Sequence, residues 1–345
     1  MTAVYVAGTG RGVGKTALTG ALALHAKQSG QPVALLKPFV SGQCKTNNLQ
    51  DRDVEFYAQL SDVPLPEGWP MQLALSTSND YSEILERVAN VVGTLERNGA
   101  KVILEGVDIM ESDQDSMGLS AMIVKNLGAN VVLCSGHDFS TARHSLDAVA
   151  SLFGDRLTGV DLNRIPPHSL MEIKNSLIPS MYKDGYKLVA TVPEARRMLS
   201  PTVSQVASHL GAALINESET TEALGEHSMG GGWVLDQGAY VFSRRDNKAV
   251  VVRGDRSDIQ MAALATSTAC LILTAGMPPI QYVIYHAEQS QTPMLVVPYA
   301  TSEAMERLGN VCDSASVHSL KKIAYYAELL KSSCVPENLL GDNGE

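Results

Sequence analysis

Short apolar runs alternate with longer amphipathic stretches from residue 3 to residue 192. The apolar runs have the length and the bounding turn residues of buried strands, and they cover residues 3–7, 32–40, 101–105, 130–134, 157–162 and 187–192. The stretches between them are long enough for crossover helices at 17–28, 81–98, 119–127, 140–153 and 170–182. This alternation predicts an α/β fold with a mostly parallel sheet and helices on both faces. Such a sheet binds ligands at the carboxyl ends of its strands, so polar residues that follow the strands are the first functional candidates.

A second, smaller α/β domain is predicted after a polar boundary at residues 213–226. A helix at 202–210, with Gly211 as its stop, comes just before that boundary. We expect later strands at 240–242, 249–252, 270–273, 283–285 and 294–297 and helices at 256–266 and 301–308. The predicted domains are therefore residues 1–215 and 226–320, followed by a C-terminal helix and acidic tail at 321–345.

A glycine-rich segment, Gly8-Thr9-Gly10-Arg11-Gly12-Val13-Gly14-Lys15-Thr16, joins the first strand to the first helix. Glycines let the backbone curl closely around phosphates, and the start of the following helix points unpaired N–H groups at them. The residues expected to bind nucleotide here are Gly8, Gly10, Gly12, Gly14, Lys15 and Thr16, with Lys15 on the outer phosphates and the Thr16 hydroxyl on Mg²⁺. The common spacing would place a glycine at Thr9, and the alternative is a glycine-rich turn with no ligand.

Lys37 ends the second predicted strand, within the sequence Leu36-Lys37-Pro38-Phe39-Val40-Ser41-Gly42. A lysine between a buried strand and a Ser-Gly turn is placed to enter the cleft beside Lys15. A second cation there would neutralise phosphate charge or stabilise phosphoryl transfer. Lys15 and Lys37 are therefore the candidate catalytic residues, and Ser41 is a candidate nucleotide contact. The alternative for Lys37 is a solvated lysine at a strand end.

Two acidic positions are candidate ligands of Mg²⁺ beside Thr16. Glu105 ends an apolar strand, where a carboxylate is expensive to bury without a partner. Mg²⁺ would be that partner, and a neighbouring lysine is the alternative. Asp53, like Asp51, precedes the helical run 54–60, so it either binds Mg²⁺ or caps the helix.

Asn163 follows another predicted strand and is a candidate contact to the base. Its amide offers a donor and an acceptor side by side, which suits the edge of adenine. A turn before Pro166-Pro167 is the alternative.

Composition narrows the class of partner. The chain of 345 residues has a formal net charge of −10. This acidic balance argues against a nucleic-acid partner, which needs a basic surface. No apolar run approaches the ~20 residues of a membrane-spanning helix, and the five cysteines are scattered along the chain. We expect a cytoplasmic protein with free thiols and no membrane partner.

Taken together, these motifs resemble dethiobiotin synthetase over the first ~210 residues. That family has a similar glycine-rich loop, a Lys-Pro-Val-x-Ser-Gly-like element matched by Lys37 to Gly42, and a Val-Glu-Gly acid matched by Leu104-Glu105-Gly106. It also has a metal-binding aspartate matched by Asp53 and a base-contacting asparagine matched by Asn163. The resemblance implies a P-loop NTPase-type domain that takes ATP and Mg²⁺ as cofactors.

The whole chain is still more similar to the N-terminal part of long bacterial phosphate acetyltransferases. There a dethiobiotin-synthetase-like domain is joined to a so-called DRTGG domain, whose signature is matched by Gly254-Asp255-Arg256 and Leu273-Thr274-Ala275-Gly276, with Ala275 in place of a glycine. The acetyltransferase catalytic domain would need some hundreds of residues after 310, so phosphate acetyltransferase activity is not expected. The glycine-rich substrate loop of dethiobiotin synthetase is replaced by Val107-Asp108-Ile109-Met110.

Three functions stay open. The first is a nucleotide-responsive regulatory or sensor protein of acyl-phosphate, acetyl-phosphate or cofactor metabolism, which would respond to a small-molecule metabolite. The second is an ATP-dependent ligase that activates a carboxylate, with Lys15, Lys37 and Mg²⁺ stabilising the transition state. The third is an interaction module with a vestigial P-loop. The resemblance also implies a homodimer.

Overall fold

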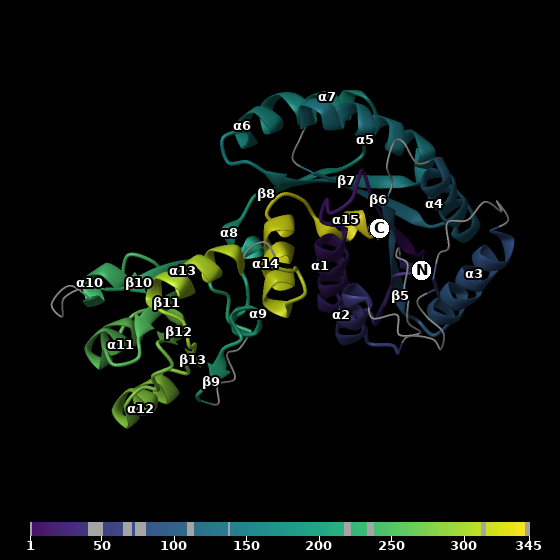
Figure 1. The fold of residues 1–345 in the computed structure, drawn as a ribbon. Helices are drawn as coiled ribbons and strands as arrows, with labels where there is room; N and C mark the ends of the chain where they lie inside the picture. The colour runs from purple at the N-terminus through teal and green to yellow at the C-terminus, as the bar shows by residue number, and fades with distance from the viewer. Residues whose placement is uncertain are drawn as a thin grey trace. The chain divides into compact units, whose positions relative to one another are not determined.

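The computed structural model describes residues 2–40, 51–64, 71–72, 81–108, 114–136, 139–216, 222–232, 238–311 and 315–341. The chain forms two compact units (Figure 1). Unit 1 comprises Met1–Glu194 together with Lys322–Glu345, and unit 2 comprises Ala195–Lys321.

Unit 1 is built on a six-stranded sheet of order β2-β5-β1-β6-β7-β8 in which every neighbouring pair is parallel. The strands are β1 (Val4–Gly8), β2 (Val33–Leu36), β5 (Lys101–Asp108), β6 (Asn130–Ser135), β7 (Leu157–Ile165) and β8 (Val189–Pro193). A short parallel pair lies apart, β3 (Phe39–Val40) with β4 (Met71–Gln72). The strands are near-continuous apolar runs because helices cover both faces of the sheet.

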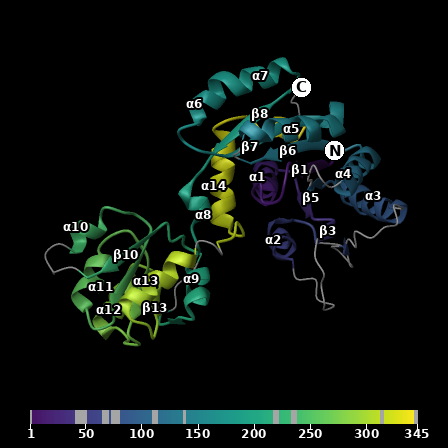
Figure 2. The same cartoon turned by 45° about the horizontal axis from the view of Figure 1, so that its top comes forward.

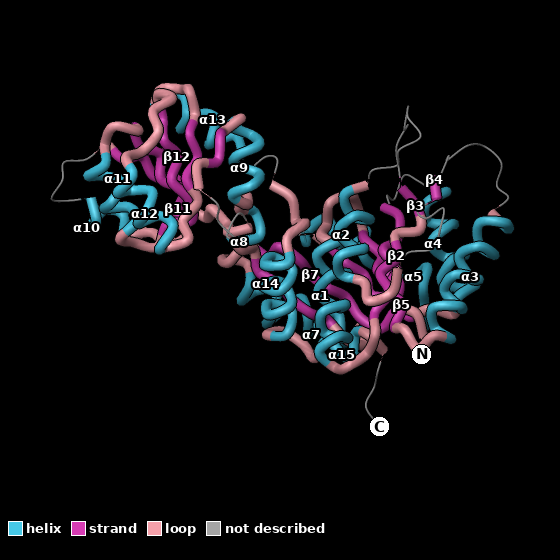
Figure 3. The backbone as a smooth tube through the Cα atoms, turned by 90° about the horizontal axis from the view of Figure 1, so that it is seen from below, coloured by secondary structure: helices cyan, strands magenta, loops and turns pink. Residues whose placement is uncertain are grey.

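Two layers of helices cover this sheet (Figure 3). One layer holds α3 (Ser82–Arg97), α4 (Gln114–Leu127), α5 (Phe139–Phe153), α6 (Leu170–Glu172) and α7 (Ile178–Lys183), with the short turns η1 (Gly154–Arg156) and η2 (Ile173–Leu177). The other holds α1 (Lys15–Gln28), α2 (Arg52–Leu60), α14 (Leu320–Lys331) and α15 (Pro336–Leu339). Helix α3 shows the pattern behind this packing, since it buries Val88, Val92 and Leu95 at helical spacing.

Unit 2 has a five-stranded sheet of order β10-β11-β12-β13-β9, in which only β9 is antiparallel to its neighbour. Figure 2 shows this unit, with β10 and β13 of the sheet and the surrounding helices labelled. Its strands are β9 (Ala213–Leu214), β10 (His227–Gly231), β11 (Lys248–Arg253), β12 (Thr268–Thr274) and β13 (Met294–Val296). Helices α9 (Val203–Leu210) and α13 (Thr301–Gly309) pack on one face. The other face is covered by α10 (Gly238–Phe242), α11 (Ser257–Leu264) and α12 (Gln281–Gln289), and α8 (Arg196–Leu199) precedes α9.

The predicted fold class is confirmed: a mostly parallel α/β sheet is followed by a smaller α/β unit. The expected strands at 240–242 and 283–285 are wrong, because both segments are helical, in α10 and α12. Val283 and Ala287, one helical turn apart, carry the buried face of α12. A three-residue apolar run cannot distinguish these two states. Strand β10 lies in a segment where no strand was expected.

The compact units divide the chain differently from the ranges expected from sequence. Helix α9 belongs to unit 2 because Val203, Val206 and Leu210 join the core against its sheet. The chain from Lys322 onward belongs to unit 1. Unit 2 is therefore inserted between two parts of unit 1.

Candidate functional site

The glycine-rich loop lies at the carboxyl edge of the unit 1 sheet, where β1, β5 and β6 end together. Gly8 at the end of β1 is aligned with Asp108 of β5 and with Cys134 of β6. The loop is anchored to β6 by the N–H of Thr9, which donates to the carbonyl of Cys134 at 3.0 Å. Helix α1 begins at Lys15, and no described side chain caps its N-terminus. Its first N–H groups are therefore available to an anionic ligand.

Gly14 has two reasons to be glycine. Its φ is 114°, a conformation that side chains rarely adopt, and a Cβ there would lie 2.0 Å from Nδ2 of Asn163. The close approach of Asn163 to the loop therefore depends on the missing side chain at this position.

Lys15 is nearly enclosed and pairs with Asp108. Its side chain is 6% exposed, whereas that of Asp108 is 34% exposed. The pairing partner comes from β5, the strand next to β1. A carboxylate thus pairs with the ammonium group that the P-loop motif assigns to phosphate.

Lys37 lies between two carboxylates at the start of α2. Its Nζ is 2.9 Å from Oδ2 of Asp51 and also pairs with Asp53. Asp51 is the helix cap, since its side chain accepts from the N–H of Asp53 at 2.8 Å. Burial lowers the pKa of Lys37, but the charges of Glu105 and Asp53 and the hydrogen bonds to Asp53 and Asp51 raise it overall, so Lys37 stays a cation.

Glu105 is buried beneath these groups and accepts a hydrogen bond from the hydroxyl of Tyr57. Burial, and then the charge of Asp53, raise the pKa of the Glu105 carboxyl to about 7, against the opposing charges of Lys37 and Lys15. The carboxylates of Asp53 and Glu105 repel each other, and Thr16 is the second residue of α1. These three side chains supply oxygen ligands of the kind that Mg²⁺ prefers. No group of three His, Cys, Asp or Glu side chains forms a ready-made metal cage in the described part of the chain. Mg²⁺ usually needs only one or two carboxylates beside substrate phosphates, so the fit holds.

Asn163 contacts the loop itself. Its Nδ2 donates to the carbonyl of Val13 at 2.8 Å, and its Oδ1 accepts from the N–H of Arg164 at 2.8 Å. Arg164 has a left-handed φ of 56° and donates to the carbonyl of Gly12. A contact from Asn163 to a base stays a prediction.

The structure thus brings Lys15, Lys37, Asp53 and Glu105 into one charged cluster. Asn163 is outside this cluster and contacts the backbone of the glycine-rich loop. Ser41 lies outside the described residues. Sequence reasoning missed Asp108 and Tyr57 as members of the cluster, and it gave Asp51 no bond to Lys37. Asp108 carried a usable signal, because it is an acidic residue near the carboxyl end of a central strand.

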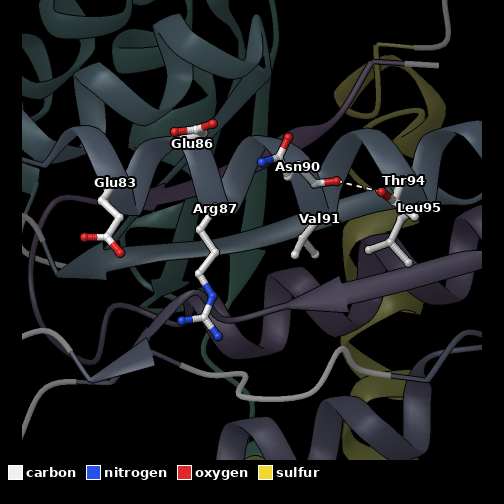
Figure 4. Close-up of a pocket in the computed structure, with 7 residues that line it drawn as sticks. All are labelled: Glu83, Glu86, Arg87, Asn90, Val91, Thr94 and Leu95. Atoms are coloured by element: carbon white, nitrogen blue, oxygen red, sulfur yellow. Dashed lines mark hydrogen bonds between the residues drawn. The ribbon is translucent and has the colours of Figure 1, made fainter.

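Two pockets lie away from this cluster. One, of about 500 Å³, runs along α3, and Figure 4 shows its lining residues Glu83, Glu86, Arg87, Asn90, Val91, Thr94 and Leu95. The other, of about 220 Å³, is in unit 2 and includes Arg197, Glu226 and Asn247. Neither pocket is lined by a predicted site residue.

Among the described helices, none is long and apolar enough to cross a membrane.

The parallel sheet, the glycine-rich loop after β1 and the lysine that begins α1 define unit 1 as a P-loop NTPase-like domain. A family model described as an AAA domain matches residues 2–202, and one described as a DRTGG domain matches residues 205–311. The chain therefore belongs to this AAA domain family and carries a DRTGG domain as its second part.

The chain is also similar to curated proteins of two kinds. The chain is 31% identical over 154 residues to the ATP-dependent dethiobiotin synthetase of Mycobacterium leprae, which covers 42% of this chain and 66% of that protein. It is 24% identical over 298 residues to the phosphate acetyltransferase of Haemophilus influenzae, which covers 77% of this chain and 41% of that enzyme. The chain thus spans slightly less than two thirds of the first relative and less than half of the second.

Similar solved structures include a nucleotide-binding protein from Archaeoglobus fulgidus in complex with ADP, at 16% identity, with 56% of this chain and 82% of that chain covered and a TM-score of 0.33. Another contains the CBS and DRTGG domains of Clostridium perfringens pyrophosphatase complexed with diadenosine tetraphosphate, at 14% identity, with 45% and 74% covered and a TM-score of 0.30. TM-scores this low support no functional comparison.

Proposed function

We propose that unit 1 binds ATP with Mg²⁺ and that the protein is a nucleotide-responsive regulator of acyl-phosphate, acetyl-phosphate or cofactor metabolism. The observation that carries the proposal is the charged cluster at the glycine-rich loop. Lys15 pairs with Asp108, Lys37 pairs with Asp53, and the charges of both lysines lower the pKa of Glu105. Phosphate oxygens would replace carboxylates on the lysines, and Mg²⁺ would lie between phosphate and the acids Asp53 and Glu105 with Thr16.

A regulatory role is favoured by what surrounds the nucleotide site. The similarity to a phosphate acetyltransferase covers 77% of this chain, which is more than unit 1 alone and therefore reaches into unit 2. Asp108 follows the Glu105-Gly106 pair where dethiobiotin synthetase has a glycine-rich substrate loop, and here it occupies Lys15. Nucleotide binding must therefore displace a native ion pair, which couples occupancy to a structural change. The further parts of the proposal are a small-molecule metabolite as effector, a homodimer and a cytoplasmic location.

The alternative is an ATP-dependent ligase similar to dethiobiotin synthetase. It is favoured by the 31% identity to that enzyme and by Lys37, a second cation that pairs with the candidate metal ligand Asp53. In such a reaction a substrate carboxylate would attack the γ-phosphorus and displace ADP, and an amine would then displace phosphate from the acyl phosphate. Lys37 would stabilise the charge on the transferring group.

Calorimetry with ATP and Mg²⁺ on the purified full chain tests the proposal, combined with measurement of ADP release. Lys15→Ala should weaken ATP binding by at least about a hundredfold, because it removes a nearly enclosed cation from the phosphate site. Lys27→Ala is the matched control, since Lys27 lies on the same helix in a more exposed pair with Asp62. Binding with negligible ADP release supports the regulator, whereas ADP release that requires an added carboxylate supports the ligase. An equal ATP affinity of Lys15→Ala and the wild type, or no binding to the folded wild type, would overturn both readings in favour of an interaction module.

A further inference from the structure

The chain after unit 2 packs directly against the helix that follows the glycine-rich loop. Neither family model covers this segment, because the DRTGG match ends at residue 311. Ile323 of α14 lies 3.0 Å from where a Cβ of Gly20 would stand in the middle of α1. A ring nitrogen of His25, also on α1, is 3.1 Å from the carbonyl oxygen of Ala327. Glycine inside a helix costs roughly 1 kcal/mol relative to alanine, and its presence here permits the close approach of α14.

Below the loop, α14 reaches a buried acid on β7. The hydroxyl of Tyr326 donates to Oδ2 of Asp161 at 2.6 Å, and both side chains are buried. The other carboxylate oxygen, Oδ1, has no hydrogen-bond partner among the described residues. Burial raises the pKa of Asp161 to about 7, although the hydrogen bonds from Tyr326 and Cys134 oppose the rise. A buried carboxyl that is only partly satisfied stabilises a fold poorly, so its presence calls for another reason.

Cys134 joins this acid to the glycine-rich loop. Its Sγ is 3.8 Å from Oδ2 of Asp161 and 3.4 Å from the carbonyl oxygen of Val13. Asn163, two residues after Asp161 on the same face of β7, donates to that same carbonyl. The Val13 carbonyl is thus contacted from β7 by Asn163 and from β6 by Cys134, whose single S–H can donate either to this carbonyl or to Asp161.

The orientation of the Val13 carbonyl also sets the direction of the Gly14 N–H, which belongs to the same peptide group. The N–H and C=O of a trans peptide point in opposite directions. When the Val13 carbonyl is drawn towards Cys134 and Asn163, the N–H of Gly14 is turned away from them. Backbone N–H groups at this point of a P-loop are the donors that cradle phosphate.

We propose that Tyr326 and Asp161 are positioning residues of the nucleotide site, which act through Cys134 and the Val13 carbonyl to aim the Gly14 N–H. This inference rests on the proposed nucleotide site. It adds that the affinity of this site for nucleotide depends on the C-terminal segment, which returns from unit 2 to unit 1 and carries Tyr326. Tyr326, Asp161 and Cys134 are not candidates for direct contact with nucleotide.

Two conservative variants test the proposal. Tyr326→Phe removes only the hydroxyl, and Cys134→Ala removes the sulfur between the acid and the loop. Tyr325→Phe is the matched control, because it makes the same change one residue earlier on the same helix. Each variant is compared with the wild type by calorimetry with ATP and Mg²⁺ and by the amide resonance of Gly14 in protein labelled with ¹⁵N-glycine.

We expect Tyr326→Phe and Cys134→Ala each to weaken ATP binding about three- to tenfold, as loss of one hydrogen bond would. The double variant should be no weaker than the weaker-binding single variant, because both act through one chain of contacts. The Gly14 amide should shift in both without nucleotide, while the amide of Gly30 at the far end of α1 does not. A general loss of stability would not select Gly14 in this way.

Additive losses in the double variant, or an unmoved Gly14 amide in folded Tyr326→Phe, would overturn the proposal. So would a loss of affinity in Tyr325→Phe as large as in Tyr326→Phe. If the wild type binds no nucleotide, the proposed function fails, and the Gly14 resonance still decides whether the C-terminal helix sets the loop.

Discussion

The ammonium group of Lys15, the first residue of α1, pairs with the carboxylate of Asp108, the last residue of β5. Asp108 is aligned with Gly8 of β1, the first residue of the glycine-rich loop. The ion pair of Lys15 and Asp108 therefore lies at the carboxyl edge of the sheet, beside this loop. An anionic ligand and Asp108 would therefore compete for one cation.

Asp108→Asn is expected to increase ATP affinity about three- to tenfold, because it removes that competing charge. Calorimetry of the variant and the wild type at one ionic strength measures the change. The control is Asp62→Asn, which breaks the exposed pair with Lys27 in the same unit and should leave affinity unchanged. Unchanged or weaker binding in Asp108→Asn would mean that the pair does not oppose the ligand.

Gly14→Ala is expected to reduce ATP affinity more than about tenfold, since a Cβ would collide with Asn163 and displace the loop. The control is Gly30→Ala, at a φ of 78° with nothing within 4 Å of the added carbon. It should cost about 1 kcal/mol of stability through its backbone conformation alone and leave ATP affinity intact. Thermal unfolding and calorimetry on both variants separate the two effects, and equal losses of affinity would contradict the assignment of Gly14.

The pH dependence of stability should carry the signature of Asp161. Its pKa is raised from 3.8 to about 7 in the folded chain, so between these values the folded state binds the proton more tightly than the unfolded state. Its contribution to stability is greatest below pH 3.8, declines as pH rises to about 7 and is then level. The decline is on the order of 4 kcal/mol over the whole window, because each unit of pKa difference corresponds to about 1.4 kcal/mol.

The measurement is the free energy of unfolding by denaturant at several pH values from about 4 to about 8, which cover the expected decline. Asp161→Asn cannot ionise and should show a flatter profile than the wild type. Asp155→Asn, at an exposed position of the same unit, should keep the wild-type profile. Identical slopes in the wild type and Asp161→Asn would show that Asp161 does not titrate in this range.

Leu339→Ala should destabilise unit 1 by about 2–4 kcal/mol, because it empties a fully buried position in the C-terminal segment. Leu339 fills the space beside Gly159, where a Cβ would lie 2.4 Å from its Cδ2. Met171→Ala, at a side chain of unit 1 that is 67% exposed, is the control and should change stability by less than about 0.5 kcal/mol. Equal effects of the two substitutions would argue against the docking of this segment on unit 1.

Much of the fold and part of the site could be predicted from sequence, because their signals are local. The apolar runs of unit 1 are long enough to mark strands, and the glycine-rich segment has a fixed place between strand and helix. Lys15, Lys37 and Asp53 could be named because each lies near an element end at the carboxyl edge of the sheet, and Glu105 because it follows the apolar run of β5, which continues to Asp108. Their roles with ATP and Mg²⁺ stay predictions.

What could not be predicted depends on contacts distant in sequence. Asp161 is an acid inside an apolar strand, and nothing local indicates that Tyr326, far along the chain, lies against it. The amphipathic pattern of α14 predicts a helix but not which unit it covers. In α10 and α12, tertiary packing decided between helix and strand for runs too short to carry a period.

The insertion of unit 2 within unit 1 has a consequence for biosynthesis. On the ribosome, the strands of the first sheet emerge long before Leu339 and Leu340, which are buried against that unit. At about 5–20 residues per second, the intervening stretch delays their arrival by on the order of ten seconds. Unit 2 can complete its fold during that interval, whereas the amino-terminal part must wait with apolar surface uncovered. Nascent chains should therefore recruit chaperones most strongly in this window.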